Sequence, residues 1–458
     1  LEQVNLLTQP IYHRYIMHDL VRLYAGHLAD REPKHDRSAA LARLFNYYTH
    51  TASTAARIAY PYEFEDQPEL SQAQTITPSL NNPADATDWL DDNLRHLLAA
   101  ASLVGRDRPA HTIALSRIMH RHLCIRSCYA EACTLHNLAL SVAQRTGDRY
   151  EEPRALIRLG DIHRLRDDYQ SAARYYRTAL EFTASTHARA DQLNALIGLG
   201  QVHRMRAEYE AAADHFTHAL DIARSIGSQI GEMRALYGLG NIHAAHNRHE
   251  AAANCLSNSR AIAQTIGSRV DELNALNGLG HIHRLQARYD TAGNHFTHAL
   301  DIAQSVGSRI GELDALIGLG TVYRIKQSYA QARKHLTSAL TIASADGDLN
   351  GQFEARHGLG VIHQATKQVN DALDNHRKAL DLATTRENLV DQARAHDGLA
   401  TAHHALGHHD LARHHWQTAL DILTHLDLDS TDELPDKTTI RARLNDLHRQ
   451  EPNRTNNP

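Results

Sequence analysis

The sequence is poor in the residues that cross-link a chain or anchor it in a membrane. Four cysteines among 458 residues are too few for a disulfide framework, and they are typical of a reducing compartment. No apolar run reaches the length that a membrane-spanning helix needs, and we recognise no signal peptide. We therefore expect a cytoplasmic protein that makes no membrane contact.

Lysine is also scarce, and positive charge does not dominate. Only six lysines accompany 42 arginines, and the formal net charge is −5. A chain that binds nucleic acid by its general surface carries a basic excess, which this chain lacks. We expect no direct nucleic-acid binding by it.

Recognisable catalytic motifs are missing as well. The sequence contains no Gly-x-x-x-x-Gly-Lys-Ser/Thr phosphate loop, no Gly-x-Ser-x-Gly and no dinucleotide fingerprint. Without the amides and the lysine of a phosphate loop, nucleotide phosphates have no cradle. The sequence thus predicts a protein that is not an enzyme and that holds no cofactor of its own.

Histidine is abundant, with 35 residues, and this raises the question of a metal site. No carboxylate or thiolate completes a persuasive ligand set near the densest group, and Gly407 is expected to end the helix there. We predict no metal. The densest group consists of His403, His404, His408, His409, His414 and His415.

The clearest positive feature is a repeat of 40 residues. A Leu-Gly pair recurs without insertion or deletion, and a Leu-Ala pair closes the series. A fixed period of this size indicates stacked units that bury their apolar faces only against neighbours. The pairs begin at Leu159, Leu199, Leu239, Leu279, Leu319, Leu359 and Leu399.

Each block contains two apolar stripes of helical period. In residues 191–230, one stripe includes Leu196 and Leu199, and the other includes Phe216 and Leu220. Glycines at 227, 267, 307 and 347 are placed to end the second helix in the left-handed conformation. Ser228, Ser268 and Ser308 are suited to cap the next helix, and Ser268 with Asp271 resembles an acidic capping box.

The glycine of each Leu-Gly pair falls inside the first helix, where it costs about 1 kcal/mol relative to alanine. Its recurrence predicts a close approach of a neighbouring helix. We expect small pairs on the second helix to be its counterparts. These pairs are Ala172-Ala173, Ala212-Ala213 and Ala251-Ala252.

This pattern resembles the tetratricopeptide repeat (TPR), whose features here are Leu199-Gly200, His203, Ala212, Phe216 and Ala219. The resemblance implies an all-α, right-handed superhelical solenoid of about eight helix-turn-helix units. Six histidines hold the aromatic slot of the repeat, where we expect half-buried, neutral packing residues. They are His163, His203, His243, His283, His363 and His403, with Tyr323 in the remaining copy.

The N-terminal region carries a second resemblance. We expect a short strand at Tyr12–Ile16 and an amphipathic helix at Asp19–Leu28. Met17-His18-Asp19 resembles the MHD motif of NB-ARC (STAND) ATPases, which implies that His18 and Asp19 belong to a nucleotide sensor. The segment Asp88–Leu94 is similar to one that precedes TPR arrays in actinobacterial regulators of the antibiotic regulatory (SARP) type.

These features divide the chain into five parts. Residues 1–31 are the end of a winged-helix subdomain, and residues 32–108 are a helical connector. Residues 109–429 form the TPR array, residues 430–450 a capping helix, and residues 451–458 a disordered tail. The chain begins with leucine rather than methionine, and we expect it to be part of a longer polypeptide.

In TPR proteins the first helices line a concave groove, so this resemblance implies three columns of groove residues. Stacked arginines and amides can bind carboxylates and peptide backbone through forked hydrogen bonds. Alternatively, the arginines stabilise helix C-termini or pair with Asp221, Asp301 or Asp381. The columns are Arg164, Arg204, Arg284 and Arg324; Asp161, Gln201, Asn241, His281 and Thr321; and Asn194, Arg234, Asn274 and Asp314.

Taken together, the resemblances imply the sensing or partner-binding arm of a STAND-type signalling ATPase, in the class of actinobacterial transcriptional regulators. Its partner would be a protein or acidic peptide in the groove, and its own NB-ARC domain in a full-length protein. ATP or ADP is expected only with that domain. The alternatives are a free-standing TPR adaptor or peptide receptor, and an antiphage or stress STAND sensor.

Overall fold

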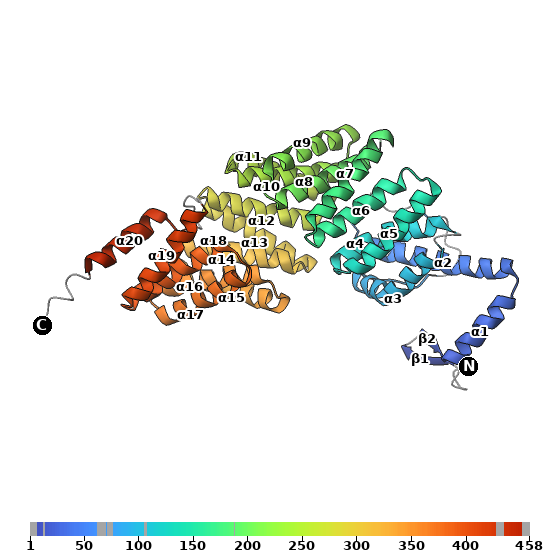
Figure 1. Cartoon of the computed structure of the whole chain (residues 1–458), viewed down its shortest axis with the longest axis horizontal. Coiled ribbons are helices and arrows are strands. Elements are labelled where there is room, and N and C mark those ends of the chain that lie inside the picture. Colours follow the sequence, from blue (N-terminus) through green and yellow to red (C-terminus); the bar gives the residue numbers. More distant parts are fainter. Residues whose placement is uncertain are drawn as a thin grey trace. The chain divides into compact units, whose positions relative to one another are not determined.

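The computed structural model describes residues 7–11, 14–61, 70, 77–104, 108–186, 188–426 and 435–450. The chain divides into two compact units, residues 1–202 and 203–458, and each is considered by itself. Nearly all of the described residues are helical (Figure 1). The prediction of an all-α solenoid of repeated helix pairs is confirmed.

Unit 1 begins with a small β-hairpin and three helices. Strand β1 (Leu7–Ile11) pairs antiparallel with β2 (Arg14–Met17), so the expected strand exists and has a partner. Helix α1 (Asp19–Arg31) buries none of its residues. Helices α2 (Lys34–Ala59) and α3 (Pro83–Val104) share a core with α4 (Pro109–Ile125) through Ala52, Leu90 and Leu115.

Eight helix pairs follow, each with a first and a second helix. Their spacing reproduces the 40-residue period. Figure 1 draws these helices as the cyan to red ribbons. The pairs are α4 (Pro109–Ile125) with α5 (Tyr129–Thr146), α6 (Glu151–Leu165) with α7 (Tyr169–Thr186), α8 (Arg189–Met205) with α9 (Tyr209–Ile226), α10 (Gln229–Ala245) with α11 (His249–Ile266), α12 (Arg269–Leu285) with α13 (Tyr289–Val306), α14 (Arg309–Ile325) with α15 (Tyr329–Asp346), α16 (Leu349–Ala365) with α17 (Val369–Thr385), and α18 (Leu389–Ala405) with α19 (His409–His425).

The predicted caps form at most helix ends. Gly227 and Gly307 end their helices with φ of 71° and 69°, a conformation that glycine adopts without strain. The Ser228 hydroxyl accepts a hydrogen bond from the Gly231 amide at 3.1 Å. Ser268 differs from the prediction, because its hydroxyl donates to Asp271 Oδ2 at 2.6 Å and caps no amide.

The helical glycines face large side chains, and this corrects the expected pairing with small residues. A Cβ added at Gly280 would lie 2.7 Å from the ring of Phe296, and one added at Gly318 would lie 2.4 Å from the same ring. Phe296 on α13 is thus held between its own first helix and the next one. The bulky residue of the second helix reaches the glycines most closely, whereas the Ala252 carbonyl of one alanine pair lies 3.5 Å from a Cβ added at Gly240.

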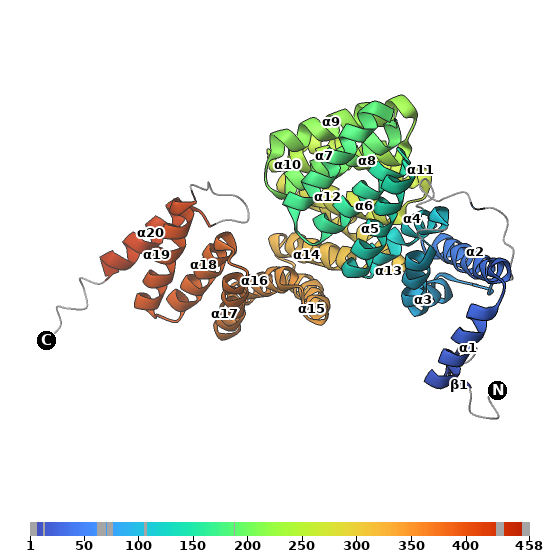
Figure 2. The ribbon, with the colours of Figure 1, turned by 45° about the vertical axis from the view of Figure 1, so that its right-hand side comes forward.

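The C-terminal end of unit 2 is covered by α20 (Lys437–Gln450), which lies next to α19 in Figure 2. Ile440, Leu444 and Leu447 are buried against Trp416 and Leu420. The predicted disordered tail, 451–458, lies outside the described residues. None of the helices in the described part of the chain is long and apolar enough to cross a membrane.

We predict that Gly318→Ala lowers the free energy of unfolding by about 1–3 kcal/mol, because overpacking forces the ring of Phe296 or the helix to move. Gly293→Ala is the matched control. It lies in α13, where an added Cβ would be 3.7 Å from its nearest neighbour, Val322. There the higher helix propensity of alanine should stabilise by up to about 1 kcal/mol. Thermal melting of both variants tests this, and equal shifts in one direction would contradict it.

Candidate functional site

The first helices form the inner face of the stack in unit 2. Each of α10, α12, α14 and α16 contacts the next first helix as well as the second helices beside it. The second helices make no comparable contact with one another among the described residues. In a curved stack, the elements on the inner side approach most closely, so the first helices line the concave surface.

Helix α14 illustrates which side chains reach that surface. Asp314, Ile317, Thr321 and Arg324 are exposed or half-buried at helical spacing, and the residues between them pack inside the stack. The same register in α10 and α12 presents two of the predicted columns. The sequence-derived positions therefore lie on one face of each first helix, as the TPR resemblance implies.

The arginine column is less open than its spacing suggests. Arg164 is half-buried, and its Nη2 lies 3.8 Å from Asp161 Oδ1. Arg204 is half-buried and donates to Met205 Sδ, and Arg324 is half-buried as well. Arg284 is only 5% exposed, so little of it is available to an incoming ligand. All four lie in the last turn of their helices or directly beside it, where a cation also favours the helix dipole.

The column that begins at Asn194 is more accessible, and the column that begins at Asp161 is half-buried throughout. Asn194 and Arg234 are exposed, and Asn274 is half-buried. Gln201 and Asn241 belong to the column that begins at Asp161, and both are half-buried. These side chains keep hydrogen-bonding groups at the surface of the first helices, as ligand binding in a groove requires.

Two further members of these columns are engaged by neighbours within unit 2. The ring of His281 lies edge-on against Phe296, with centroids 5.0 Å apart. The pKa of the Asp314 carboxyl is raised, because the surrounding protein limits its solvation.

Sequence reasoning missed polar contacts that join successive first helices. Arg394 Nη1 and Nη2 donate to the two carboxylate oxygens of Glu354 at 2.7 and 2.9 Å. Gln364 Nε2 donates to the Gly398 carbonyl at 2.7 Å. Glu354 and Arg394 hold the same register as Asp314, so extending that column by 40 and 80 residues would have found them.

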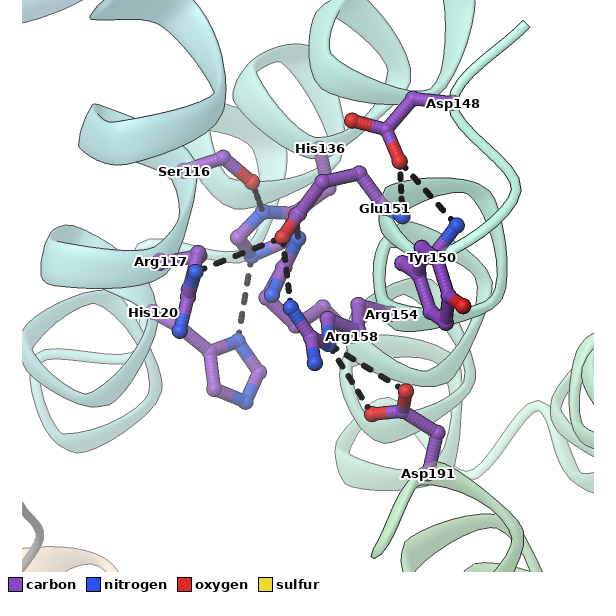
Figure 3. A network of polar contacts seen from close by, with 10 residues as sticks. All are labelled: Ser116, Arg117, His120, His136, Asp148, Tyr150, Glu151, Arg154, Arg158 and Asp191. Carbon is purple, nitrogen blue, oxygen red and sulfur yellow. Dashed lines mark hydrogen bonds and ion pairs between the residues drawn. The ribbon is translucent and has the colours of Figure 1, made fainter. Parts of the chain in front are cut away.

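Unit 1 carries a denser network on its first helices (Figure 3). Glu151 Oε1 accepts from Arg117 Nη1 at 3.3 Å and from Arg154 Nη1 at 2.9 Å. Arg158 Nη2 lies 3.6 Å from Glu151 Oε2, and Arg154 Nε donates to Asp191 Oδ1 at 3.1 Å. Three guanidinium groups thus share two carboxylates, and mutual pairing occupies much of this surface.

The slot histidines pack as expected and also bond to the following turn. His163 Nδ1 lies 2.9 Å from Asp168 Oδ2, and His363 Nδ1 lies 3.0 Å from Gln368 Oε1. The ring of His283 stacks on His295 with centroids 5.2 Å apart. These slot rings therefore join the two helices of their repeat at the turn, whereas His243 Nδ1 is buried with no hydrogen-bond partner among the described residues.

The two residues of the MHD-like motif lie where β2 meets α1. His18 Nδ1 accepts a hydrogen bond from the Leu20 amide at 3.4 Å. Asp19 Oδ1 pairs with Arg22 Nη2 at 2.7 Å, and both side chains are largely exposed. Their role in sensing nucleotide stays a prediction.

In the described part of the chain, no group of three or more His, Cys, Asp or Glu could hold a metal ion.

Comparison with known proteins places the chain in a family. A family model described as tetratricopeptide repeat matches residues 111–185, 191–265, 271–345 and 351–425. The chain therefore belongs to the tetratricopeptide-repeat family. Among curated proteins, none matches the sequence.

Three solved structures are similar in fold. The STAND protein with a tetratricopeptide repeat sensor PH0952 from Pyrococcus horikoshii has a TM-score of 0.55 at 13% identity, covering 86% of this chain and 65% of that chain. The apo quorum sensor NprR from B. thuringiensis has a TM-score of 0.53 at 11% identity, covering 74% and 97%. A Rap protein complexed with Competence and Sporulation Factor has a TM-score of 0.52 at 15% identity, covering 74% and 97%.

We predict that unfolding is pH-dependent through buried histidines. Burial, and to a smaller extent His363, lowers the pKa of His376 from 6.5 to about 4. As pH falls, the unfolded chain therefore binds the proton first, and stability that is complete above pH 6.5 is lost between there and about pH 4. The melting temperature should be lower at pH 5 than at pH 7.5.

His376→Leu isolates one of these groups. Leu256 and Leu336 occupy the same register in other repeats and lie against the equivalent helical glycines there, so leucine fits this position. At pH 5 the variant should gain about 2 kcal/mol relative to its effect at pH 7.5. A variant whose pH profile matches that of the wild type would show that His376 titrates normally in the folded chain.

Proposed function

We propose that this chain is the sensing arm of a STAND-type signalling ATPase, in the class of transcriptional regulators of secondary metabolism. The observation that carries the proposal is the order of its parts. An exposed MHD-like motif at His18 and Asp19 is followed by helices α2 and α3 and then by eight TPR pairs. The fold likeness to a STAND protein with a TPR sensor, which covers 86% of this chain, supports this order.

In this proposal the groove of unit 2 binds a protein or an acidic peptide. Arg204, Arg234 and Arg324 are cations of the predicted columns that stay exposed or half-buried on its first helices, and Asn241 and Asn274 add amides that can bond to peptide backbone. The overall charge of −5 disfavours duplex DNA as the ligand. Ligand binding would then be transmitted to the ATPase through the helices that precede the array.

A second candidate is a free-standing peptide receptor that acts without an ATPase. The fold likeness to a quorum sensor and to a Rap protein complexed with Competence and Sporulation Factor favours it. An antiphage or stress STAND sensor remains a third. The gene upstream of Leu1 separates the first two candidates, because only the STAND proposal requires a phosphate loop to be encoded there.

We expect no tight nucleotide binding by this chain, because its sequence supplies no phosphate loop for the β-phosphate of ADP. Isothermal titration calorimetry with ADP and Mg²⁺ should show no micromolar site, and ATP should not be hydrolysed. The same titration on a longer protein that includes an NB-ARC domain is the positive control. A micromolar site on this chain alone would overturn the assignment of nucleotide binding to a separate domain.

The groove proposal is tested with fluorescent extended peptides that alternate Glu or Asp with small residues, beside matched peptides carrying Lys. The wild-type chain should prefer the acidic series. Arg234→Glu and Arg324→Glu together should weaken that binding, because each lost charge-assisted hydrogen bond is worth roughly 1.5–3 kcal/mol. Arg284 is unsuitable for this test, because charge reversal at a buried position would destabilise the fold.

Arg333→Glu is the matched control for the same change of charge. It lies exposed on the second helix α15, away from the inner face. It should leave peptide affinity nearly unchanged, and all variants should melt within a few degrees of the wild type. If Arg333→Glu weakens binding as much as the groove variants do, the effect comes from net charge and the groove is not the site.

A further inference from the structure

One cysteine of unit 1 lies in an unusual electrostatic environment. Cys124, near the end of α4, is half-buried, and its Sγ is 3.9 Å from both ring nitrogens of His120, one turn earlier in the same helix. His120 Nε2 lies 3.4 Å from Asp161 Oδ2 on α6. Arg164, one turn beyond Asp161, pairs with the same carboxylate at 3.8 Å. The thiol therefore faces two basic side chains and one acid.

The hydrogen bonds of His120 are consistent with a charged ring. Burial opposes protonation of His120, but interactions with Cys124 and Asp161 outweigh it and raise its pKa to about 10. In the charged form, Nε2–H donates to Asp161, and Nδ1–H donates to His136 Nε2 at 3.1 Å. His136 can accept because burial, followed by the charge of His120, keeps its pKa well below 6.5.

The series of hydrogen bonds from His120 through His136 ends at Ser116, whose Oγ lies 2.8 Å from His136 Nδ1 (Figure 3). With His136 neutral, Nδ1–H donates to this hydroxyl and Nε2 remains the acceptor for His120. Side chains from α4, α5 and α6 thus hold the imidazolium ring in place beside the sulfur of Cys124.

Two other cysteines of the chain lie in the opposite environment. Burial, followed by the charges of Glu131 and Asp91, raises the pKa of the Cys128 thiol. Burial alone raises the pKa of the Cys255 thiol on α11. Both groups are therefore poor nucleophiles near neutral pH, because the thiolate is the reactive form. They serve as internal controls for Cys124.

We propose that Cys124 is a reactive thiol and a site of covalent modification by small electrophiles, with His120 as its cationic partner and Asp161 as the residue that positions His120. His120 places a positive charge beside the sulfur that attacks the electrophile. In the reaction, a sulfur lone pair forms the new bond to carbon. The bond from carbon to the leaving group breaks, the leaving group departs with that electron pair, and the thiol proton passes to solvent.

The test is limited alkylation of the whole chain with iodoacetamide at pH 7, followed by mass spectrometry of the four cysteine peptides. Cys124 should react at least about tenfold faster than Cys128 and Cys255. His120→Gln should remove most of this advantage and leave the rate at Cys255 unchanged. Equal rates in the wild type, or an unchanged Cys124 rate in a folded His120→Gln variant, would overturn the proposal.

A second measurement needs no substitution and so does not depend on the folding of a variant. Iodoacetate is the anionic counterpart of iodoacetamide, and the cations His120 and Arg164 should attract it. The ratio of iodoacetate to iodoacetamide rates should therefore be higher at Cys124 than at Cys255, and lowest at Cys128, which lies beside two acids. The reverse order would show that no net positive charge acts on the Cys124 sulfur.

Discussion

Most of the repeats depend on one contact, in which a large side chain of the second helix is held between glycines of two successive first helices. Phe296 fills this place between Gly280 and Gly318, and His376 fills it between Gly360 and Gly398. The thickness of one side chain therefore sets the spacing of the first helices. Because every such side chain also positions the next repeat, a residue inserted into a helix would disturb the contacts of the repeats beyond it. This accounts for a period that runs without insertion or deletion.

The sequence predicted the helix pairs and their ends, because period, glycine caps and apolar stripes are local signals. It failed on the partner of the helical glycines. A glycine indicates that something approaches closely, but it does not say how far the approaching side chain extends. Ala212 and Phe216 are both buried on the same face of α9, and only packing in three dimensions selects the phenylalanine as the residue that reaches Gly238.

The sequence predicts which positions of the candidate site face the same side of the helices. It does not show which of those side chains are already paired with a neighbour. Positions 40 residues apart lie on equivalent faces, so the columns could be derived from the sequence. Whether a side chain in a column can bind a ligand depends on the residue opposite it in the next repeat. Arg394 pairs with Glu354 because that neighbour is acidic. Arg234 stays exposed, and the residue at the same position of the next repeat is Asn274. A single sequence specifies these identities, but the distances that make them pairs come from the stacking of the helices.

Under the proposed function, the differences between repeats at their inner positions would determine which ligand binds. The glycines and the side chains between them are interchangeable in role, and they build the same contact in most of the repeats. Inner positions vary in charge from one copy to the next. In unit 1, Glu151 and Asp191 neutralise much of the arginine charge internally. Unit 2 leaves Arg234, Asn241 and Asn274 accessible. Polar groups that are already paired offer a ligand little net gain in free energy, so the first helices of unit 2 are the stronger candidate for the binding surface.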